Sequence, residues 1–272
     1  MPFQFPNGSE YQLLLLDTNV LSNIVKNKNH EFENLIQQFL SKKYAPCFSF
    51  QSIIEIRKSS LGGKDELYKS FIELFSIVPC LMVYPYQQIT NQEIENFIIK
   101  KSSIDFNKAL NAFSPLGKDD SYIFDKWVDS VIGKLGSTIE IEEKENIDTA
   151  INWNLEKYSL QSKHQVIPYP LFEKAFFRNF FAIARPEINS MIYSPNDFPA
   201  IKAMCITKFD RMFKMSKVIN VNDVYDVLIS AAIPYMDAVI MEKHQIDVLR
   251  QNQLNLSQLS KVKRYTLANL KQ

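Results

Sequence analysis

The amino-acid sequence predicts an α/β fold, in which a central, mainly parallel sheet is interrupted by a large all-helical insertion. The run of four leucines at 13–16 is typical of a strand that is buried on both faces, as in a parallel sheet. Short apolar runs alternate with helical spacing up to residue 86 and again after residue 197. Between them, the spacing of apolar residues indicates helices throughout 87–197.

The composition is that of a globular protein without a strongly charged surface. Hydrophobic residues make up 46% of the 272 residues, charged residues make up 22%, and the formal net charge is +1. This balance excludes a basic coat as the main nucleic-acid-binding device, but it allows a local basic patch. The three cysteines have no paired spacing and predict buried thiols in a reducing compartment.

The apolar runs are too short for a membrane span. A spanning helix needs about 18 to 20 apolar residues, and residues 1–7 lack the charged and apolar regions of a signal peptide. We therefore expect a cytoplasmic protein with no membrane partner.

The two ends of the chain predict the strands and helices of one core. Strands are expected at 13–16, 44–50, 77–84 and 238–241, and helices at 20–25, 32–40, 51–57, 67–75, 201–212 and 222–234. We expect 11–86 and 198–252 to form this core, with 253–272 as a C-terminal basic tail or helix.

The middle of the chain predicts the helical insertion at 87–197. Helices are expected at 91–100, 105–113, 119–135, 140–160 and 171–184, separated by Ser-Pro, Gly-Ser and Pro-Tyr-Pro breaks. The last helix carries five phenylalanines at helical spacing, namely Phe172, Phe176, Phe177, Phe180 and Phe181. We interpret them as core residues; the alternative is that they stack on unpaired bases beside Lys174, Arg178 and Arg185.

An acid ends two of the expected strands. Asp17 follows the strand at 13–16, and Glu242 follows the strand at 238–241. In open α/β sheets ligands bind beyond the carboxyl ends of the strands, so both side chains are expected in a cleft. For Asp17 the alternative is that it, or Thr18, simply caps the following helix.

Two expected helix starts carry further acids. Glu55 lies early in the helix after the second strand, although the spacing of Ser52 and Glu55 also fits a capping box. Asp223 and Asp226 are three residues apart and project to one side of the first turns of their helix. Strands that end in a carboxylate and helices that begin with one can bring these acids together at one edge of the sheet.

The order of these motifs resembles the PIN domain, a family of metal-dependent nucleases, and in particular its longer bacterial members. The resemblance rests on Asp17-Thr18-Asn19 after a strand, Glu55 early in a helix, Asp223 or Asp226 before Ile-Ser-Ala-Ala, and Glu242-Lys243 after Val-Ile-Met. It covers about residues 11–80 and 198–252 and implies a three-layer PIN-like fold. Two ligands stay open: the third acid is Asp223 or Asp226, and Asp237 could replace Glu242, since the family often ends this motif with Thr-x-Asp.

Such a cluster of carboxylates suits hard divalent cations, and we expect Mg²⁺ or Mn²⁺ as the cofactor. Bound metal would activate water and stabilise the charge on a phosphodiester oxygen during in-line displacement. The expected catalytic residues are Asp17, Glu55, Asp223, Asp226 and Glu242, and the candidate metal ligands are these five and Asp237. Thr18 and Asn19 are expected to hold the loop or to orient the acids by hydrogen bonds, and His244 is expected to have a surface role.

The resemblance implies cleavage of single-stranded RNA rather than DNA, in a toxin or a defence against phage. Cations that could hold the substrate phosphates are Arg57, Lys58, Lys243 and Arg250, together with the basic segment 261–264. An inhibitory or regulatory protein partner and a homo-oligomer are also compatible with the sequence. Two alternatives stay open: a catalytically inactive PIN-like module that binds nucleic acid or protein, and a phosphatase-like hydrolase with the same metal centre.

Overall fold

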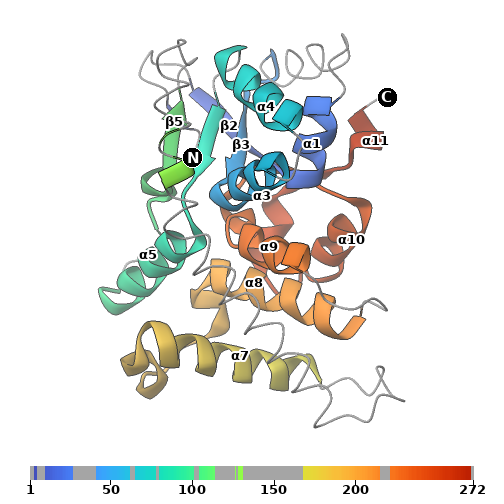
Figure 1. Cartoon of the computed structure of the whole chain (residues 1–272). Coiled ribbons are helices and arrows are strands. Elements are labelled where there is room, and N and C mark those ends of the chain that lie inside the picture. The colour runs from blue at the N-terminus through green and yellow to red at the C-terminus, as the bar shows by residue number, and fades with distance from the viewer. Residues whose placement is uncertain are drawn as a thin grey trace.

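The computed structural model of the chain describes residues 3–4, 10–26, 41–61, 65–77, 80–100, 104–113, 126, 128–130, 168–214 and 221–270 (Figure 1). The helices expected at 32–40 and 140–160, and most of the helix expected at 119–135, lie outside these residues. None of the described helices is long and apolar enough to cross a membrane.

The strands of the described residues form one sheet. They are β1 (Phe3–Gln4), β2 (Glu10–Leu16), β3 (Tyr44–Ser49), β4 (Cys80–Val83), β5 (Leu110–Phe113), β6 (Ala238–Ile240) and β7 (Lys263–Tyr265). The strand order is β5-β4-β3-β2-β6-β7, and β1 pairs with β2. The neighbours from β4 to β7 in this order are parallel, whereas β1 and β5 are antiparallel to their partners. The predicted α/β class with a mainly parallel sheet is therefore confirmed.

The helices connect these strands. The α-helices are α1 (Thr18–Lys26), α3 (Phe50–Leu61), α4 (Asp65–Ile77), α5 (Tyr86–Ile98), α7 (Tyr169–Ala184), α8 (Pro199–Phe209), α9 (Val221–Ser230), α10 (Lys243–Gln251) and α11 (Leu267–Leu270). The short 3₁₀ turns are η1 (Phe106–Ala109), η3 (Pro186–Ser190), η4 (Pro195–Asp197), η6 (Ile233–Tyr235) and η7 (Ser257–Lys261), and η5 (Asp210–Lys214) is a π-helix.

Alternate residues of β2 face two different helical layers, as the run of leucines predicted. Leu14 and Leu16 pack in one buried cluster with residues of α1, α3 and α4. Leu13 and Leu15 pack in a second cluster with residues of α8 and α10. Residues of α9 contribute to both clusters. The result is a three-layer arrangement of helices, sheet and helices, with α9 near one end of the sheet (Figure 1).

The segment expected as an all-helical insertion also contains a strand, so that part of the prediction is wrong. A helix was expected at 105–113, but η1 there is followed by β5, which pairs antiparallel with β4. The buried Ala109 and Leu110 lie in the cluster that covers this face of the sheet. The spacing of these apolar residues fits a helix, yet the segment pairs with β4 and covers the backbone groups along that edge of the sheet.

The aromatic residues of α7 pack against the core, which confirms the interpretation as core residues for three of the five, whereas Phe176 and Phe180 are half-buried. Phe172, Phe177 and Phe181 are buried in a third cluster. Phe181 contacts Phe198 with ring centroids 5.0 Å apart, and Phe172 contacts Phe209 at 5.3 Å. Figure 1 shows α7 outside α8, on the side away from the sheet. These rings are therefore not available for stacking on bases.

The C-terminal segment contributes β7 to the sheet, which corrects the expectation of a basic tail, while η7 and α11 partly match the alternative of a helix. β7 pairs parallel with β6, and Leu256, Leu259 and Val262 are buried in the main cluster. The Arg264 guanidinium donates to the backbone carbonyls of Leu259 and Val262, at 2.9 and 3.1 Å. The core thus extends past residue 252, because the apolar side chains between the polar residues of this segment are buried against the sheet.

Candidate metal centre

The candidate site lies where the strand order reverses. From β2 the chain continues to β3 and β4 on one side, and it returns later as β6 and β7 on the other. A crevice at the carboxyl ends of the strands is expected at such a switch point. Asp17 follows β2, and its backbone N–H donates to the carbonyl of Ile240 at 3.1 Å. The ends of β2 and β6 are therefore held side by side, with Glu242 two residues beyond.

Asp17 is a buried carboxylate with an incomplete set of partners. Its relative exposure is 1%, and Oδ2 has no hydrogen-bond partner among the described residues. A helix cap would accept from the second or third N–H of α1, whereas the Asp17 carboxylate interacts with the N–H of Thr18. The explanation that Asp17 only caps α1 therefore leaves Oδ2 unexplained.

The electrostatics of Asp17 show which acids surround it. Burial, and then the charges of Asp226, Glu55 and Glu242, raise the pKa of Asp17 to about 8. The contact with the Thr18 N–H opposes this rise. Three of the predicted site acids thus lie close enough to repel the charge of Asp17, although the four residues come from four separate segments of the chain.

Glu55 lies in the second turn of α3, and the first turn of this helix is capped by a serine hydroxyl. α3 begins at Phe50, and Ser49 Oγ accepts from the backbone N–H of Ser52 at 3.0 Å. Ser49 is therefore the cap, and Ser52 lies inside the helix, so the alternative of a Ser52–Glu55 capping box is wrong. Thr18 Oγ1 donates to Ser52 Oγ at 2.9 Å, which ties the turn after β2 to the start of α3.

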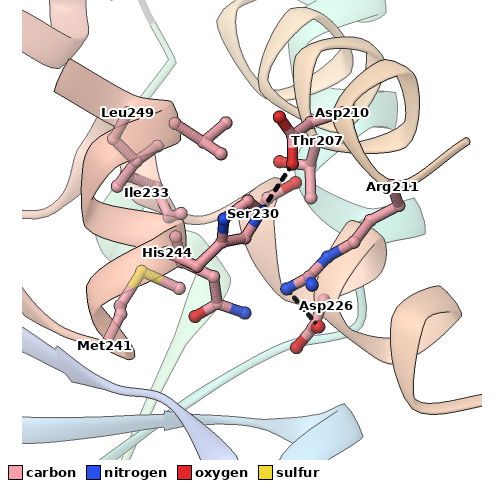
Figure 2. A pocket seen from close by; sticks show the side chains of 11 residues that line it. Thr207, Asp210, Arg211, Asp226, Ser230, Ile233, Met241, His244 and Leu249 are labelled. Atoms are coloured by element: carbon pink, nitrogen blue, oxygen red, sulfur yellow. Dashed lines mark hydrogen bonds and ion pairs between the residues drawn. The ribbon is translucent and has the colours of Figure 1, made fainter. Parts of the chain in front are cut away.

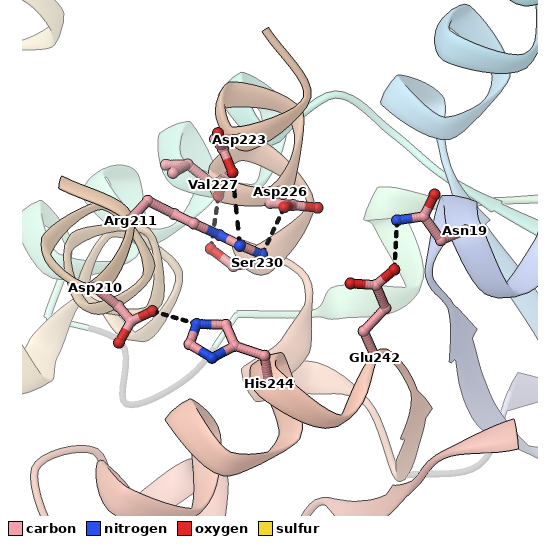
Figure 3. Close-up of polar contacts among 9 residues, drawn as sticks. All are labelled: Asn19, Asp210, Arg211, Asp223, Asp226, Val227, Ser230, Glu242 and His244. Carbon is pink, nitrogen blue, oxygen red and sulfur yellow. Dashed lines mark hydrogen bonds and ion pairs between the residues drawn. The ribbon is translucent and has the colours of Figure 1, made fainter. Parts of the chain in front are cut away.

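The two acids of α9 share one guanidinium (Figure 3). Arg211 Nη2 lies 2.6 Å from Asp226 Oδ2, and Arg211 Nη1 lies 3.6 Å from Asp223 Oδ1. Burial raises the pKa of Asp226 to about 6, and the charges of Asp223 and Glu242 add to the rise. The Arg211 charge and a hydrogen bond from Gln245 act in the opposite direction. Asp226 therefore lies between the guanidinium and the acids around Asp17.

Glu242 and Asp237 follow and precede the same strand, and only Glu242 reaches the cluster. Asn19 Nδ2 donates to Glu242 Oε1 at 3.0 Å, so Asn19 orients an acid as expected (Figure 3). Asp237 Oδ2 instead accepts from the backbone N–H of Leu13 at 2.8 Å. Leu13 and Asp237 lie at the opposite end of β2 and β6, about 13 Å along the strands at 3.3 Å per residue. The structure does not bring Asp237 to the other acids.

Three polar residues beside the acids were missed or underrated in the sequence. Arg211 and Asp210 were not singled out, and His244 was expected only at the surface. Asp210 Oδ2 lies 2.8 Å from His244 Nε2, and the His244 side chain is half-exposed. A signal was present, because Asp210 and Arg211 are adjacent charges in a mostly apolar helical segment, where a buried charge must be paired.

A small pocket adjoins these residues (Figure 2). Asp210, Arg211, Asp226, Ser230, His244 and Gln245 line it on the polar side. Ile233, Met241 and Leu249 form part of its apolar wall. The pocket lies next to the acids rather than over Asp17.

Of the expected phosphate-binding cations Arg57, Lys243 and Arg250, whose side chains the structure describes, Lys243 is exposed beside the acids. Lys243 follows Glu242 at the start of α10 and is exposed. Arg57 donates to both carboxylate oxygens of Asp129, at 2.9 and 3.2 Å, and lies over the ring of Tyr68. Arg250 pairs with Asp247 on its own helix at 3.0 Å. The side chain of Lys58 lies outside the described residues.

The donor set fits a hard divalent cation in its chemistry. The cluster offers carboxylate oxygens only, and the buried Asp17 Oδ2 lacks a partner among the described residues. Within the described residues no three acidic, histidine or cysteine side chains are arranged closely enough to enclose an ion as they stand. Metal binding would therefore include rotation of side chains such as the exposed Glu242.

No known protein family, curated protein or solved structure matches this chain. The resemblance to the PIN domain therefore stays a hypothesis that rests on the motifs, and the function is argued from the site itself.

Proposed function

We propose that the chain is a metal-dependent nuclease of the PIN type, which hydrolyses phosphodiester bonds. One observation carries the proposal: Asp17 is buried at the carboxyl edge of the sheet, with Oδ2 unpartnered among the described residues and three further carboxylates around it. Such a group is unfavourable for stability unless a cation compensates it. Acids with strongly perturbed pKa values and specific charged neighbours are typical of functional sites.

The position of each acid in the cluster suggests its role in holding the metal. Asp17 is the central ligand, because it is the most buried acid and the others surround it. For the third acid of the motif we propose Asp226 rather than Asp223. Its charge acts on Asp17 more strongly than that of Glu55 or Glu242. Glu55 and Glu242 complete the set from the two sides. Bound Mg²⁺ or Mn²⁺ would supply an activated water and stabilise negative charge on the phosphate.

Single-stranded RNA is the substrate that we propose, in a toxin or phage-defence role, as the resemblance implies. Lys243 is exposed next to Glu242 and can meet a phosphate beside the acids. With a net charge of +1, the chain has little long-range attraction for a polyanion. We therefore expect few phosphate contacts and a weak dependence of binding on salt.

One observation favours the alternative of a catalytically inactive binding module. Arg211 already supplies a positive charge to Asp223 and Asp226 without any metal. A cluster that was neutralised in this way could hold its fold and bind a partner without hydrolysis. The experiment below separates the two.

The test measures Mn²⁺ binding by calorimetry, and cleavage of labelled single-stranded RNA and DNA of the same sequence. Wild type is compared with Asp17→Asn and with Asp105→Asn, an exposed acid that precedes η1 and is not one of the predicted site acids. We expect wild type and Asp105→Asn to bind Mn²⁺ and cut RNA faster than DNA, and Asp17→Asn to lose at least about 100-fold in cleavage. Equal Mn²⁺ binding by Asp17→Asn and wild type would contradict the proposal. RNA binding without cleavage in Mn²⁺ would support the inactive module.

A further inference from the structure

Arg211 is a buried cation that the proposed chemistry has not used. Its side chain is 7% exposed and belongs to η5, the π-helix that follows α8. A π-turn inside a helical segment is rare and frequently occurs at functional sites. A buried guanidinium is costly unless it is paired, and Arg211 is paired with the two acids of α9.

The two acids that contact Arg211 differ in their surroundings. The Asp223 side chain is 2% exposed and lies 3.6 Å from Arg211, whereas that of Asp226 is 17% exposed and lies 2.6 Å away. Figure 3 shows Arg211 and Asp223 on one side of Asp226, and Glu242 with Asn19 on the other. Asp226 is thus the acid of this group that borders the cluster around Asp17.

We propose that Arg211 and Asp223 form a positioning pair for Asp226, in which Asp223 holds the guanidinium and the guanidinium fixes one oxygen of the Asp226 carboxylate. The other oxygen of Asp226 is then directed to the metal that Asp17 holds. This inference rests on the proposed function, and it deepens that function by assigning Asp226 rather than Asp223 as the third ligand.

The geometry of arginine suits this role. Its planar group has several N–H donors in a fixed arrangement, so it can hold two carboxylates in defined orientations, which an ammonium group cannot do. Gln245 adds a hydrogen bond to Asp226 from α10. The neighbouring Asp210 pairs with His244 at 2.8 Å, which connects η5 to α10 as well. Partners behind a ligand orient it, and their loss typically weakens metal affinity about 10- to 100-fold.

The test compares the Mn²⁺ affinity of variants by calorimetry, with the electron paramagnetic resonance signal of free Mn²⁺ as a second readout. The variants are Asp17→Asn, Asp226→Asn, Asp223→Asn, Arg211→Gln and the double variant Arg211→Gln/Asp223→Asn. We expect Asp226→Asn to lose Mn²⁺ binding as Asp17→Asn does. Asp223→Asn and Arg211→Gln should each bind about tenfold more weakly, and the double variant should be no weaker than Arg211→Gln alone, because the two residues act as one unit.

A variant that keeps the buried positive charge separates an effect on metal binding from an effect on folding. Arg211→Lys retains the cation but cannot orient two carboxylates, so we expect weaker Mn²⁺ binding with an unchanged circular dichroism spectrum. Arg185→Lys is the matched control, because Arg185 is exposed and pairs with Glu187 far from the acids. Its Mn²⁺ affinity should equal that of wild type.

Three outcomes would overturn the inference. Loss of binding in Asp223→Asn as complete as in Asp17→Asn would make Asp223 a ligand. Unchanged or tighter binding in both Arg211→Gln and Arg211→Lys would make the guanidinium a bystander or a competitor of the metal. In both cases the proposed function would stand, provided that wild type binds Mn²⁺ and Asp17→Asn does not. Absence of Mn²⁺ binding in wild type would overturn both.

Discussion

At the scale of single residues, the charge of Asp17 that the proposed metal site requires lowers the stability of the metal-free protein. In the metal-free protein its charged form is buried and surrounded by like charges, which raise its pKa to about 8 from an ordinary value near 3.8. The folded state therefore binds this proton more tightly than the unfolded state does. The stability that the protonated form provides is complete below pH 3.8 and is lost as the pH rises toward 8.

We therefore predict that Asp17→Asn stabilises the metal-free protein. The amide has the same shape and carries no charge, so the free energy of unfolding at pH 8 should rise by about 1–3 kcal/mol. Urea denaturation in the presence of a chelator measures the difference, which should shrink as the pH is lowered to 5. Asp105→Asn should change nothing, and added Mn²⁺ should stabilise wild type but not Asp17→Asn. A metal-free Asp17→Asn protein less stable than wild type at pH 8 would contradict the argument.

The acids of the site were accessible from the sequence because each follows a local signal. Asp17 and Glu242 end apolar runs, and Glu55 and Asp226 lie near helix starts, so their type and position suffice to predict a common edge. Arg211 has no such signal beyond its charge within an apolar helix. Its contacts depend on the π-helix η5 and on the approach of α9, which local spacing does not reveal. The choice between Asp223 and Asp226 was open for the same reason.

At the scale of elements, a carboxylate from α5 caps the helix that carries Arg211 toward the site. Glu93 is buried and accepts from the first backbone N–H groups of α8, at 2.6 Å from Ala200 and 3.4 Å from Ile201. It also accepts from the hydroxyl of Tyr235. Burial raises the pKa of Glu93 to about 8, and these three donors oppose the rise. The interaction satisfies donors that the first turn of a helix always leaves open.

We predict that Glu93→Ala destabilises the protein by about 2–4 kcal/mol, because it leaves several buried donors without an acceptor. Glu95→Ala is the matched control on the same helix, since Glu95 is exposed, and it should stay within about 0.5 kcal/mol of wild type. Denaturant unfolding followed by circular dichroism gives both values. Equal stabilities of the two variants would show that α8 does not depend on this cap.

Elements were predictable where the local pattern matched the local environment. β2, β3 and β6 follow from continuous apolar runs, because parallel strands buried on both faces require them. β5 was expected as helix, because its pairing partner β4 lies about thirty residues away and leaves no trace in the local spacing. Phenylalanines at helical spacing identified α7 correctly, since their packing against α8 uses one face of each helix.

At the scale of the whole molecule, the C-terminal segment closes the side of the sheet that bears Glu242. Beyond residue 252 the sequence is mostly polar, with isolated apolar residues, and it was expected to lie outside the core. Three of these apolar residues, Leu256, Leu259 and Val262, are nevertheless buried in the main cluster beside β6. Tertiary pairing of this kind is formed by residues distant in sequence, so the spacing alone could not reveal it.

Two leucines of the C-terminal segment test whether its packing stabilises the core. Leu259 is 1% exposed and packs in the main cluster, whereas Leu254 is 93% exposed. Leu259→Ala should lower the free energy of unfolding by about 2–5 kcal/mol, because it removes buried methyl groups and leaves a cavity. Leu254→Ala should change it by less than about 0.5 kcal/mol. Denaturant unfolding of both variants decides the matter: equal stabilities would mean that 253–272 behaves as a tail after all. Loss of stability in Leu259→Ala alone would mean that the C-terminal segment is part of the core against which β6, the strand before Glu242, is packed.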